Sequence, residues 1–446
     1  MDRETLKQQV CAAIDRQGER IVALGEAIMD DPELGFKEVR TARRVAEVFA
    51  ELGLPFEEGL ALTGVKALYQ GRRPGPTVAL MGELDALVVP GHPRAHPQTG
   101  AAHACGHNAQ IAGVLGAALG LATAGAARHL DGQIAFMAVP AEEYVEIDYR
   151  VGLVREGKTR FLGGKAELLE RGHFGDVDLA LMIHSGCAEQ LDGAAGVASS
   201  SNGFLGKTAR FIGRASHAGM APEQGINALK AAQLALTAID AQRETFRDQD
   251  CVRVHPILTK GGDLVNIVPA EARLETYVRA RTSEAMLDAA AKVDRALKGA
   301  ALVLGCQVEI QTLPGYLPLR NDPLLAQLFR ENAVQLFGSG ACRDLPHSGG
   351  STDAGDLSQV MPVLHPVMKG ASGAAHSTQW HIADPEAGYL APAKALAMMA
   401  IDLLWDGAEQ ARRVVGEHRP SLSVEEYLRQ QQAIFNTEFF DAEERD

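Results

Sequence analysis

Apolar residues recur with helical spacing through the start of the chain. Between Glu4 and Asp30 they fall mostly three or four residues apart, which is the spacing of one face of an amphipathic helix. A second such pattern runs from Thr41, taken as its N-cap, to Gly53. Short, mostly apolar runs follow at 77–81, 133–139 and 179–183. Runs of this length are typical of strands that are buried on both faces.

Each of these three predicted strands ends at residues that can carry chemistry. The first leads into Gly82–Leu87, the second into Pro140–Glu143 and the third into His184. Strand, polar residue and helix therefore alternate three times, which favours a mostly parallel sheet with a site along one edge. The fold class that we predict is α/β, with a mostly parallel mixed sheet flanked by helices.

The pattern changes near Gly196. Alternating or apolar stretches at 203–214, 251–258, 273–278 and 306–313 predict strands, and 226–243 and 283–304 predict helices. The order β-α-β-β-α-β is that of a split βαβ unit, so we expect an inserted ferredoxin-like α+β domain at 197–315. Residues 1–196 and 316–446 would form the discontinuous first domain, with helices at 323–337 and 391–404, a strand at 363–368 and a tail that is helical from Val424.

Composition agrees with two soluble domains. The chain has 446 residues, of which 46% are hydrophobic and 22% charged. A formal net charge of −14 without a cluster of basic residues argues against nucleic acid as a partner. The run from Ile111 to Ala127 approaches membrane length, but its Gly and Ala content favours a buried helix, and no membrane partner is expected.

Cysteine usage and the first residues indicate a cytoplasmic protein. Six cysteines are scattered without close pairs or framework spacing, which is the pattern of reduced thiols. The segment from Met1 to Lys7 is charged and lacks the apolar core of a signal peptide.

The candidate chemistry centres on Cys105 and His107, which stand two residues apart. A carboxylate pair, Glu142 and Glu143, follows about 35 residues later at a strand end, and His376 lies in a Gly-rich stretch near the end of the chain. Thiolate, imidazole and carboxylate together can hold a borderline divalent metal and supply a base. A buried filler cysteine and a loop histidine would be the simpler reading of the first pair, but that reading leaves the acidic pair unexplained. The combination predicts a two-metal hydrolase centre.

Several stretches, in this order, resemble the landmarks of one family: Gly82–Leu87, His103–Asn108, Pro140–Glu143, Ser216–Gly219 with Gly225–Leu229, and Asn266–Pro269. They look like those of the aminoacylase/carboxypeptidase family of dinuclear metallopeptidases. The match is to its amidohydrolase branch, which includes hippurate, auxin-conjugate and aminobenzoyl-glutamate hydrolases. The resemblance implies a zinc-peptidase-like catalytic domain, with an inserted domain that acts as a lid and pairs two subunits.

The resemblance also implies roles for individual residues. Two divalent ions per chain, Zn or Mn, would be held by Cys105, His107, Glu143, His184 and His376. Glu142 would be the general base that takes a proton from water activated by the metals. Asp85 would orient a ligand imidazole.

Other positions match residues of the family that contact the substrate. His217 would reach into the site of the partner subunit of a homodimer, or of a higher homo-oligomer, and polarise the scissile carbonyl. Asn266 and Arg279 would hold the carboxylate of the substrate, and Gly373 would line its binding site. The implied reaction is hydrolysis of the amide bond of a small N-acyl or N-aroyl amino acid or of a dipeptide-like substrate.

Departures from the family pattern leave substrate and metal open. Asn108-Ala109-Gln110 stands where the branch usually has Asp, often followed by His, and Ser377-Thr378-Gln379-Trp380 replaces a commoner acidic form. Hydrolytic deamination of an aromatic amine by the same centre is one alternative. A catalytically silent small-molecule-binding protein is another, although the intact set of Glu142 and five ligand candidates argues against it. No Gly-x-Ser-x-Gly elbow indicates a serine hydrolase.

Overall fold

The structure, a computed structural model, describes residues 1–442. It divides into two compact units, each with a core of its own. The first unit contains residues 1–199, 320–346 and 356–424, and the second contains 200–319, 347–355 and 425–442.

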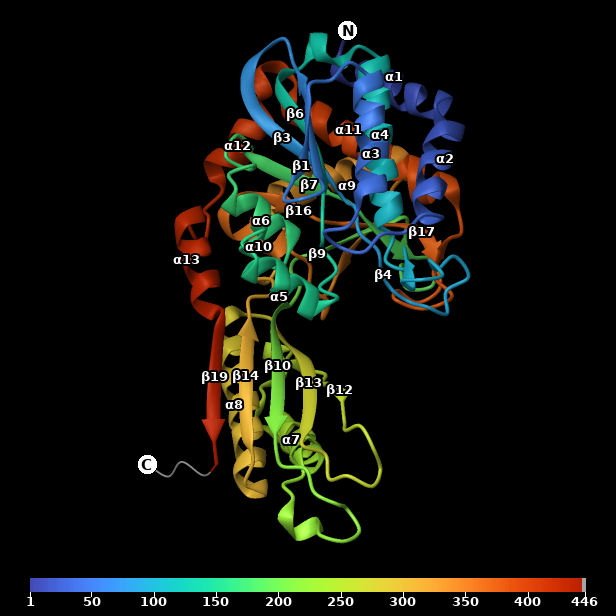
Figure 1. Cartoon of the computed structure of the whole chain (residues 1–446). Helices are drawn as coiled ribbons and strands as arrows, with labels where there is room; N and C mark the ends of the chain where they lie inside the picture. The colour runs from blue at the N-terminus through green and yellow to red at the C-terminus, as the bar shows by residue number, and fades with distance from the viewer. Residues whose placement is uncertain (443–446) are drawn as a thin grey trace. The chain divides into compact units, whose positions relative to one another are not determined.

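Six strands form the main sheet of the first unit, in the order β1-β2-β6-β3-β7-β16 (Figure 1). The strands are β1 Phe56–Leu60, β2 Gly64–Gln70, β3 Arg73–Glu83, β6 Asp131–Val139, β7 Leu179–Met182 and β16 Val363–Leu364. Strands β6, β3, β7 and β16 are parallel to one another, whereas β2 pairs antiparallel with β6 and with β1. The mixed, mostly parallel sheet confirms the predicted fold class.

Two helices fill the centre of the first unit. Helices α4 (His107–Thr123) and α11 (Ala391–Leu404) pack against each other and against β3. Gly116 allows their close approach, because a Cβ there would lie 2.7 Å from the Cβ of Ala393. Residues 107–121 are all buried, as the Gly and Ala content of this stretch predicted. The other helices that lie wholly in this unit are α1 Arg3–Arg16, α2 Gly18–Met29, α3 Val39–Glu51, α5 Ile147–Arg155, α6 Gly164–Glu170, α9 Pro323–Phe337 and α12 Glu409–Glu417, and α10 is Ala354–Val360.

One helical stretch in residues 1–442, Glu386–Leu404, is long and apolar enough to cross a membrane. It ends in α11, and 89% of its apolar window is buried inside the protein. Such burial is typical of the core helix of a folded domain.

A smaller sheet lies beside the main one in the first unit. It joins β15 (Cys342–Leu345), β9 (Ala195–Ala198), β17 (Val367–Ser372) and β18 (His381–Ile382), with β8 (His184–Cys187) paired to β17. Strands β8 and β17 are parallel and place Val367 beside His184. A short ribbon of β4 (Leu87–Val88) and β5 (Ala101–Ala102) precedes α4.

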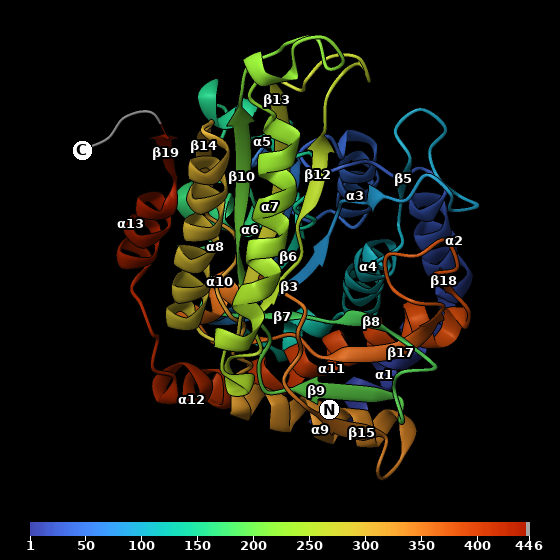
Figure 2. The same ribbon diagram turned by 90° about the horizontal axis from the view of Figure 1, so that it is seen from below.

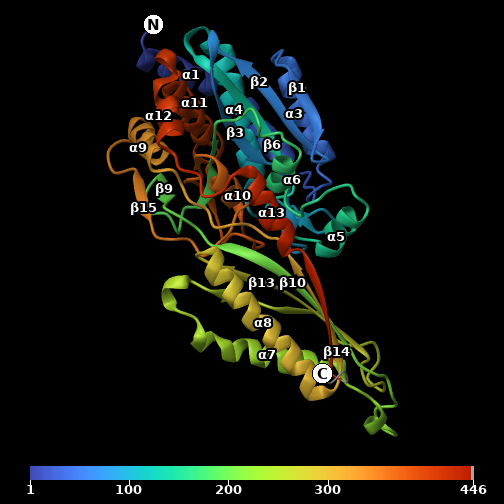
Figure 3. The ribbon, with the colours of Figure 1, turned by 90° about the vertical axis from the view of Figure 1, so that its left-hand side faces the viewer.

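The second unit is an antiparallel sheet with two helices on one face (Figures 2 and 3). The strand order is β11-β13-β10-β14-β19, with β12 also paired to β13. The strands are β10 Gly203–Ile212, β11 Arg253–Val254, β12 Ile257–Lys260, β13 Glu271–Ala280, β14 Gln307–Leu313 and β19 Asn436–Asp441, and the helices are α7 Ala228–Ala241 and α8 Ser283–Leu304. Apart from β19, this is the split βαβ topology that the sequence predicted.

Two details differ from the sequence-based expectations. The tail does not belong wholly to the first unit, because after α13 (Val424–Ile434) strand β19 pairs with β14 of the second unit. Thr41 is not an N-cap, because α3 starts two residues earlier. The carboxylate of Glu33 instead accepts hydrogen bonds from the backbone amides of Arg40 and Thr41, at 2.9 and 2.8 Å.

Candidate metal centre

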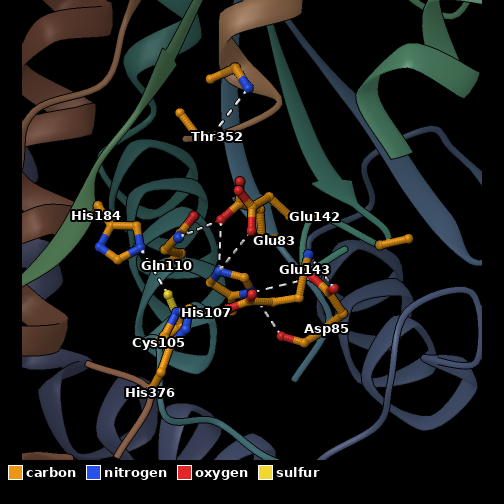
Figure 4. A network of polar contacts seen from close by, with 12 residues as sticks. Glu83, Asp85, Cys105, His107, Gln110, Glu142, Glu143, His184, Thr352 and His376 are labelled. Carbon is orange, nitrogen blue, oxygen red and sulfur yellow. Dashed lines mark hydrogen bonds and ion pairs between the residues drawn. The ribbon is translucent and has the colours of Figure 1, made fainter. Parts of the chain in front are cut away.

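Polar side chains at the carboxyl ends of β3, β6 and β7 meet in one place (Figure 4). Strand β3 ends at Glu83 and is followed by Asp85, β6 is followed by Glu142 and Glu143, and β7 by His184. These strands are parallel neighbours, so their ends reach the same edge of the sheet, where open α/β sheets bind ligands.

A glycine turn adds two more side chains from the start of α4. Gly106 precedes the helix with φ of 96°, a conformation that favours glycine. A Cβ at this position would also lie 2.8 Å from the side chain of Ser185 and 2.9 Å from Trp380. The turn sets Cys105 just before the helix and His107 at its first residue.

The five predicted metal ligands gather in two groups. Cys105, His107 and His184 form one group, and Cys105, Glu143 and His376 form the other, with the ligand atoms of each group within 4.8 Å of one another. The Sγ of Cys105 lies 3.4 Å from Nε2 of His184, and Nε2 of His376 lies 3.4 Å from Oε1 of Glu143. Because Cys105 belongs to both groups, the five side chains offer two overlapping sets of three donors, which could hold two divalent ions.

The donor atoms are better arranged to bind a divalent metal than to form hydrogen bonds with one another. Within residues 1–442, Nε2 of His107 and Oε1 of Glu143 are buried without a well-aligned hydrogen bond. Their ion-pair contacts are with Glu83 at 3.0 Å and with His376 at 3.4 Å. Burial of such atoms is costly unless they gain a partner. A thiolate, imidazoles and a carboxylate are the donors that Zn and similar ions bind.

Ionisation favours the same conclusion. Burial and the charge of Glu143 raise the pKa of Cys105, but His184 and His107 outweigh them and lower it to about 6. Burial likewise raises the pKa of Glu143, whereas the close contact with His376 and its charge lower it to about 2. Both groups are therefore anionic at neutral pH, which is the form that binds metal.

Asp85 orients two of the candidate ligands. Its Oδ2 accepts a hydrogen bond from the backbone amide of Glu143 at 2.8 Å. The Nδ1 of His107 lies 2.8 Å from the backbone oxygen of Asp85 and 3.3 Å from its Oδ1. The contact with the backbone oxygen makes Nδ1 of His107 the donor and turns its Nε2 toward Glu83 and the centre.

The structure adds a buried ion pair that we did not single out from the sequence. Lys165 Nζ lies 2.6 Å from Oε1 of Glu83, and both side chains are buried. Gln110 donates to Oε2 of Glu83 at 2.7 Å, and that oxygen lies 3.0 Å from Nε2 of His107. Burial alone would raise the pKa of Glu83, but the charges of Lys165 and His107 hold it well below its ordinary range. Glu83 could have been noticed in the sequence, because it is a charged residue at the end of an apolar strand. No feature of the sequence pointed to Lys165.

Two further histidines near the centre were also not predicted. Burial lowers the pKa of both His103 and His365 to about 3. The ring centroid of His365 lies 5.7 Å from that of His184. Both are therefore neutral at physiological pH and add no charge to the site.

The remaining predicted residues lie elsewhere in the chain. Gly373 is in the first unit, three residues before His376. His217, Asn266 and Arg279 are in the second unit. His217 is exposed and pairs through its backbone with Ile267, next to Asn266, while Arg279 lies on β13. Their roles stay predictions.

A buried clamp holds the turn that carries Glu142. Ala141 takes φ of 55°, which is unusual for a residue with a Cβ. Its backbone amide donates to Oε1 of the fully buried Glu38 at 2.8 Å, and its carbonyl accepts from Arg150 at 3.0 Å. Thr63 donates to the other oxygen of Glu38 at 2.6 Å. The conformation of the turn therefore depends on Glu38, the residue before α3, on Thr63 between β1 and β2, and on Arg150 of α5.

Replacing Glu38 by Ala is expected to impair catalysis without removing metal. The buried amide of Ala141 would lose its acceptor, at a cost of about 1 to 3 kcal/mol in the free energy of unfolding. Glu142 would move with the turn, and kcat would fall by up to about 10²-fold. Thermal unfolding, metal analysis and steady-state kinetics check this, with the exposed Glu57→Ala as control. An unchanged kcat in a destabilised variant would contradict the positioning role.

Comparison with known proteins agrees with this geometry. Residues 79–401 match the model of peptidase family M20/M25/M40. The mouse Xaa-Arg dipeptidase is 30% identical over 433 residues, covering 91% of this chain and 90% of the relative. A p-aminobenzoyl-glutamate hydrolase protein of Escherichia coli (strain K12) is 29% identical over 354 residues, covering 75% of each chain.

Solved structures share the fold. A Bacillus subtilis protein described as a dinuclear metal-binding peptidase from the M20 family superposes with a TM-score of 0.64. Its sequence identity is 22%, and the match covers 87% of this chain and 99% of that one. At this identity the likeness concerns the fold.

Proposed function

Because the chain belongs to peptidase family M20/M25/M40, we propose that it is a hydrolase that uses two divalent metal ions to cleave the amide bond of a small N-acyl amino acid or dipeptide. The observation that carries this proposal is the pair of donor groups joined by Cys105, beside the buried carboxylate of Glu142. A binding protein without catalysis would not need a second carboxylate next to the ligand Glu143.

Five side chains would hold the ions: Cys105, His107, Glu143, His184 and His376. When bound, the ions supply Lewis acidity that lowers the pKa of water and polarises a carbonyl group. The buried ion pair of Glu83 and Lys165 would keep a fixed carboxylate beside His107. Asp85 would hold the ring of His107 in place.

Glu142 would act as the general base that takes the proton from water. Its Oε2 lies 3.8 Å from Nε2 of His107. Glu142 therefore faces the centre, in a third group of donors with Glu83 and His107 that does not contain Cys105. A carboxylate in this position can accept a proton from attacking water and return it to the leaving nitrogen. Glu142 directly precedes the ligand Glu143 in the chain and follows the turn at Ala141. These neighbours fix the place of Glu142 relative to the ligands.

The relatives support a dipeptide as substrate. The mouse relative is named for Xaa-Arg dipeptides and matches 91% of this chain, whereas the E. coli relative, named for p-aminobenzoyl-glutamate, matches 75%. We therefore favour a dipeptide with a basic C-terminal residue over an aroyl amino acid.

Elemental analysis followed by a substrate screen tests the proposal. The purified chain should contain divalent metal, lose activity to a chelator and release an amino acid from Ala-Arg, hippurate or p-aminobenzoyl-glutamate. Release of ammonia from an aromatic amine, without amino acid release, would favour deamination instead. A chain that binds metal but hydrolyses none of these amides would overturn the proposal.

A homodimer would complete the site through His217. This histidine is exposed, and the amides of Gly219 and Met220 donate to its Nδ1 at 3.2 and 3.1 Å. The hydrogen bonds leave Nε2 to donate outward, as stabilisation of a developing oxyanion requires. A two-fold dimer would present one such histidine to each site.

Mixing two inactive variants tests this arrangement. His217→Ala and Glu142→Gln should each be inactive alone, but a mixed dimer would contain one site with both defects and one with neither. After random exchange, half of the dimers are mixed, so activity should return to about a quarter of the wild-type value. Steady-state rates before and after exchange measure the recovery.

Subunit exchange must be shown independently, for example with two differently tagged chains. Mixing His217→Ala with itself is the matched control and should recover nothing. Proven exchange without recovery would place His217 within its own site or outside catalysis.

A further inference from the structure

A pocket of about 340 Å³ opens in the first unit next to the loop that carries His376. Its lining includes Cys187 at the end of β8, Glu189 and Gln190 just after it, and Ser372, Gly373 and Ala374 at the end of β17. The roles described so far for metal, base and ion pair do not use this pocket.

The pocket shares its walls with two segments that supply metal ligands. Strand β8 begins at His184 and ends at Cys187, and the loop after β17 reaches His376 three residues beyond Gly373. Cys187 donates from Sγ to the backbone oxygen of Gly373 at 2.6 Å, which ties the two walls together. Three residues of strand span about 10 Å. An extended arginine or lysine side chain of a substrate bound at the metals can cover much of this span.

The pocket carries one fixed negative charge. Glu189 is exposed and accepts a hydrogen bond from the hydroxyl of Ser372, which lowers the pKa of its carboxyl group. Of the described residues that line the pocket, none is Lys or Arg. The other lining groups include a thiol, amides, a hydroxyl and His381. A cation is therefore the complementary ligand, and an anionic side chain would be repelled.

We infer that this pocket receives the cationic side chain of the C-terminal residue of the substrate, with Glu189 as the acceptor of its guanidinium or ammonium group. The inference rests on the proposed hydrolase function, and it assigns the choice of leaving amino acid to one residue. Ser372 acts as a positioning residue, because its hydroxyl holds the carboxylate of Glu189 at the pocket wall. An arginine in the pocket would form an ion pair with Glu189, which citrulline, its neutral isostere, cannot form.

A matched pair of substrates isolates this charge. The metal-loaded wild type should hydrolyse Ala-Arg with a kcat/KM at least about tenfold higher than that for Ala-citrulline. Glu189→Gln should lower kcat/KM for Ala-Arg toward that for Ala-citrulline and remove the difference between the two substrates. Because Glu189 is exposed, the variant is expected to fold normally.

The control variant is Asp192→Asn, which removes a carboxylate from the same loop outside the pocket. The side chain of Asp192 is 98% exposed and lies 3.6 Å from Arg343. Its substrate preference should equal that of the wild type. A loss of preference in both variants would indicate a general effect of net charge and would overturn the assignment to Glu189.

Calorimetric titration with free arginine and citrulline tests the ligand preference of the pocket independently of hydrolysis. Arginine should bind the wild type at least about tenfold more tightly than citrulline, and Glu189→Gln should abolish the difference. If Ala-Arg is not hydrolysed but this binding difference is found, the dipeptidase proposal fails and the pocket stands. If the wild type does not distinguish arginine from citrulline, or Glu189→Gln still does, the pocket assignment is overturned whatever the activity.

Discussion

Replacing Glu142 by Gln is expected to lower kcat by about 10²-fold or more while both metal ions stay bound. The amide keeps the size and position of the carboxylate but cannot accept a proton from water. The ligand groups that share Cys105 do not include Glu142, so its replacement leaves them complete. Steady-state kinetics and elemental analysis on the same sample check both parts of the expectation.

Glu143→Gln is the matched control, one residue away in the same turn. Glu143 belongs to the group with Cys105 and His376. Its replacement should therefore lower the metal occupancy, and the catalytic rate should fall as a consequence. Excess metal should therefore restore part of the activity of Glu143→Gln and none of that of Glu142→Gln. Equal metal content and equal rates in the two variants would show that their division of roles is wrong.

The helices that the sequence located best are those with strong local signals. Helices α8 and α9 start and end where their patterns predicted, because each has a capping side chain, Thr282 or Asp322, and a long amphipathic run. Strand β19 was missed because Asn436–Asp441 is mostly polar and exposed. It forms by adding to the edge of β14, and the partner of an edge strand cannot be read from local sequence.

The candidate ligands could be located because each follows a predicted strand or stands in a motif. The residues that support them were missed for one shared reason. Lys165 and Glu83 lie 82 positions apart in sequence, and Glu38 and Ala141 lie 103 apart. A lysine at the start of a helix would usually be solvated, and only its burial against Glu83 shows otherwise. Pattern reasoning finds side chains at strand ends, but it does not reveal which buried charges pair.

Removing Cys105 and His107 together should abolish metal binding and activity. Cys105 belongs to both ligand groups, and His107 to one, so neither group would keep three donors among the five proposed ligands. Loss of an outer partner alone typically costs about 10- to 100-fold in metal affinity, and loss of two ligands should cost more. Elemental analysis after gel filtration should find no bound metal in Cys105→Ala, His107→Ala, and kcat should fall to background.

Stability gives a second readout of the same variant that does not depend on substrate. A ligand present at 100 times its Kd stabilises the folded state by about 2.7 kcal/mol. A chelator should therefore lower the Tm of the wild type and leave that of the double variant unchanged. Cys306→Ala with His129→Ala changes the same residue types outside the candidate metal groups, and it should keep the response of the wild type. Full metal content in the Cys105 and His107 variant, or a Tm that still falls with chelator, would refute the proposed centre, because the shared thiolate is what joins its two halves.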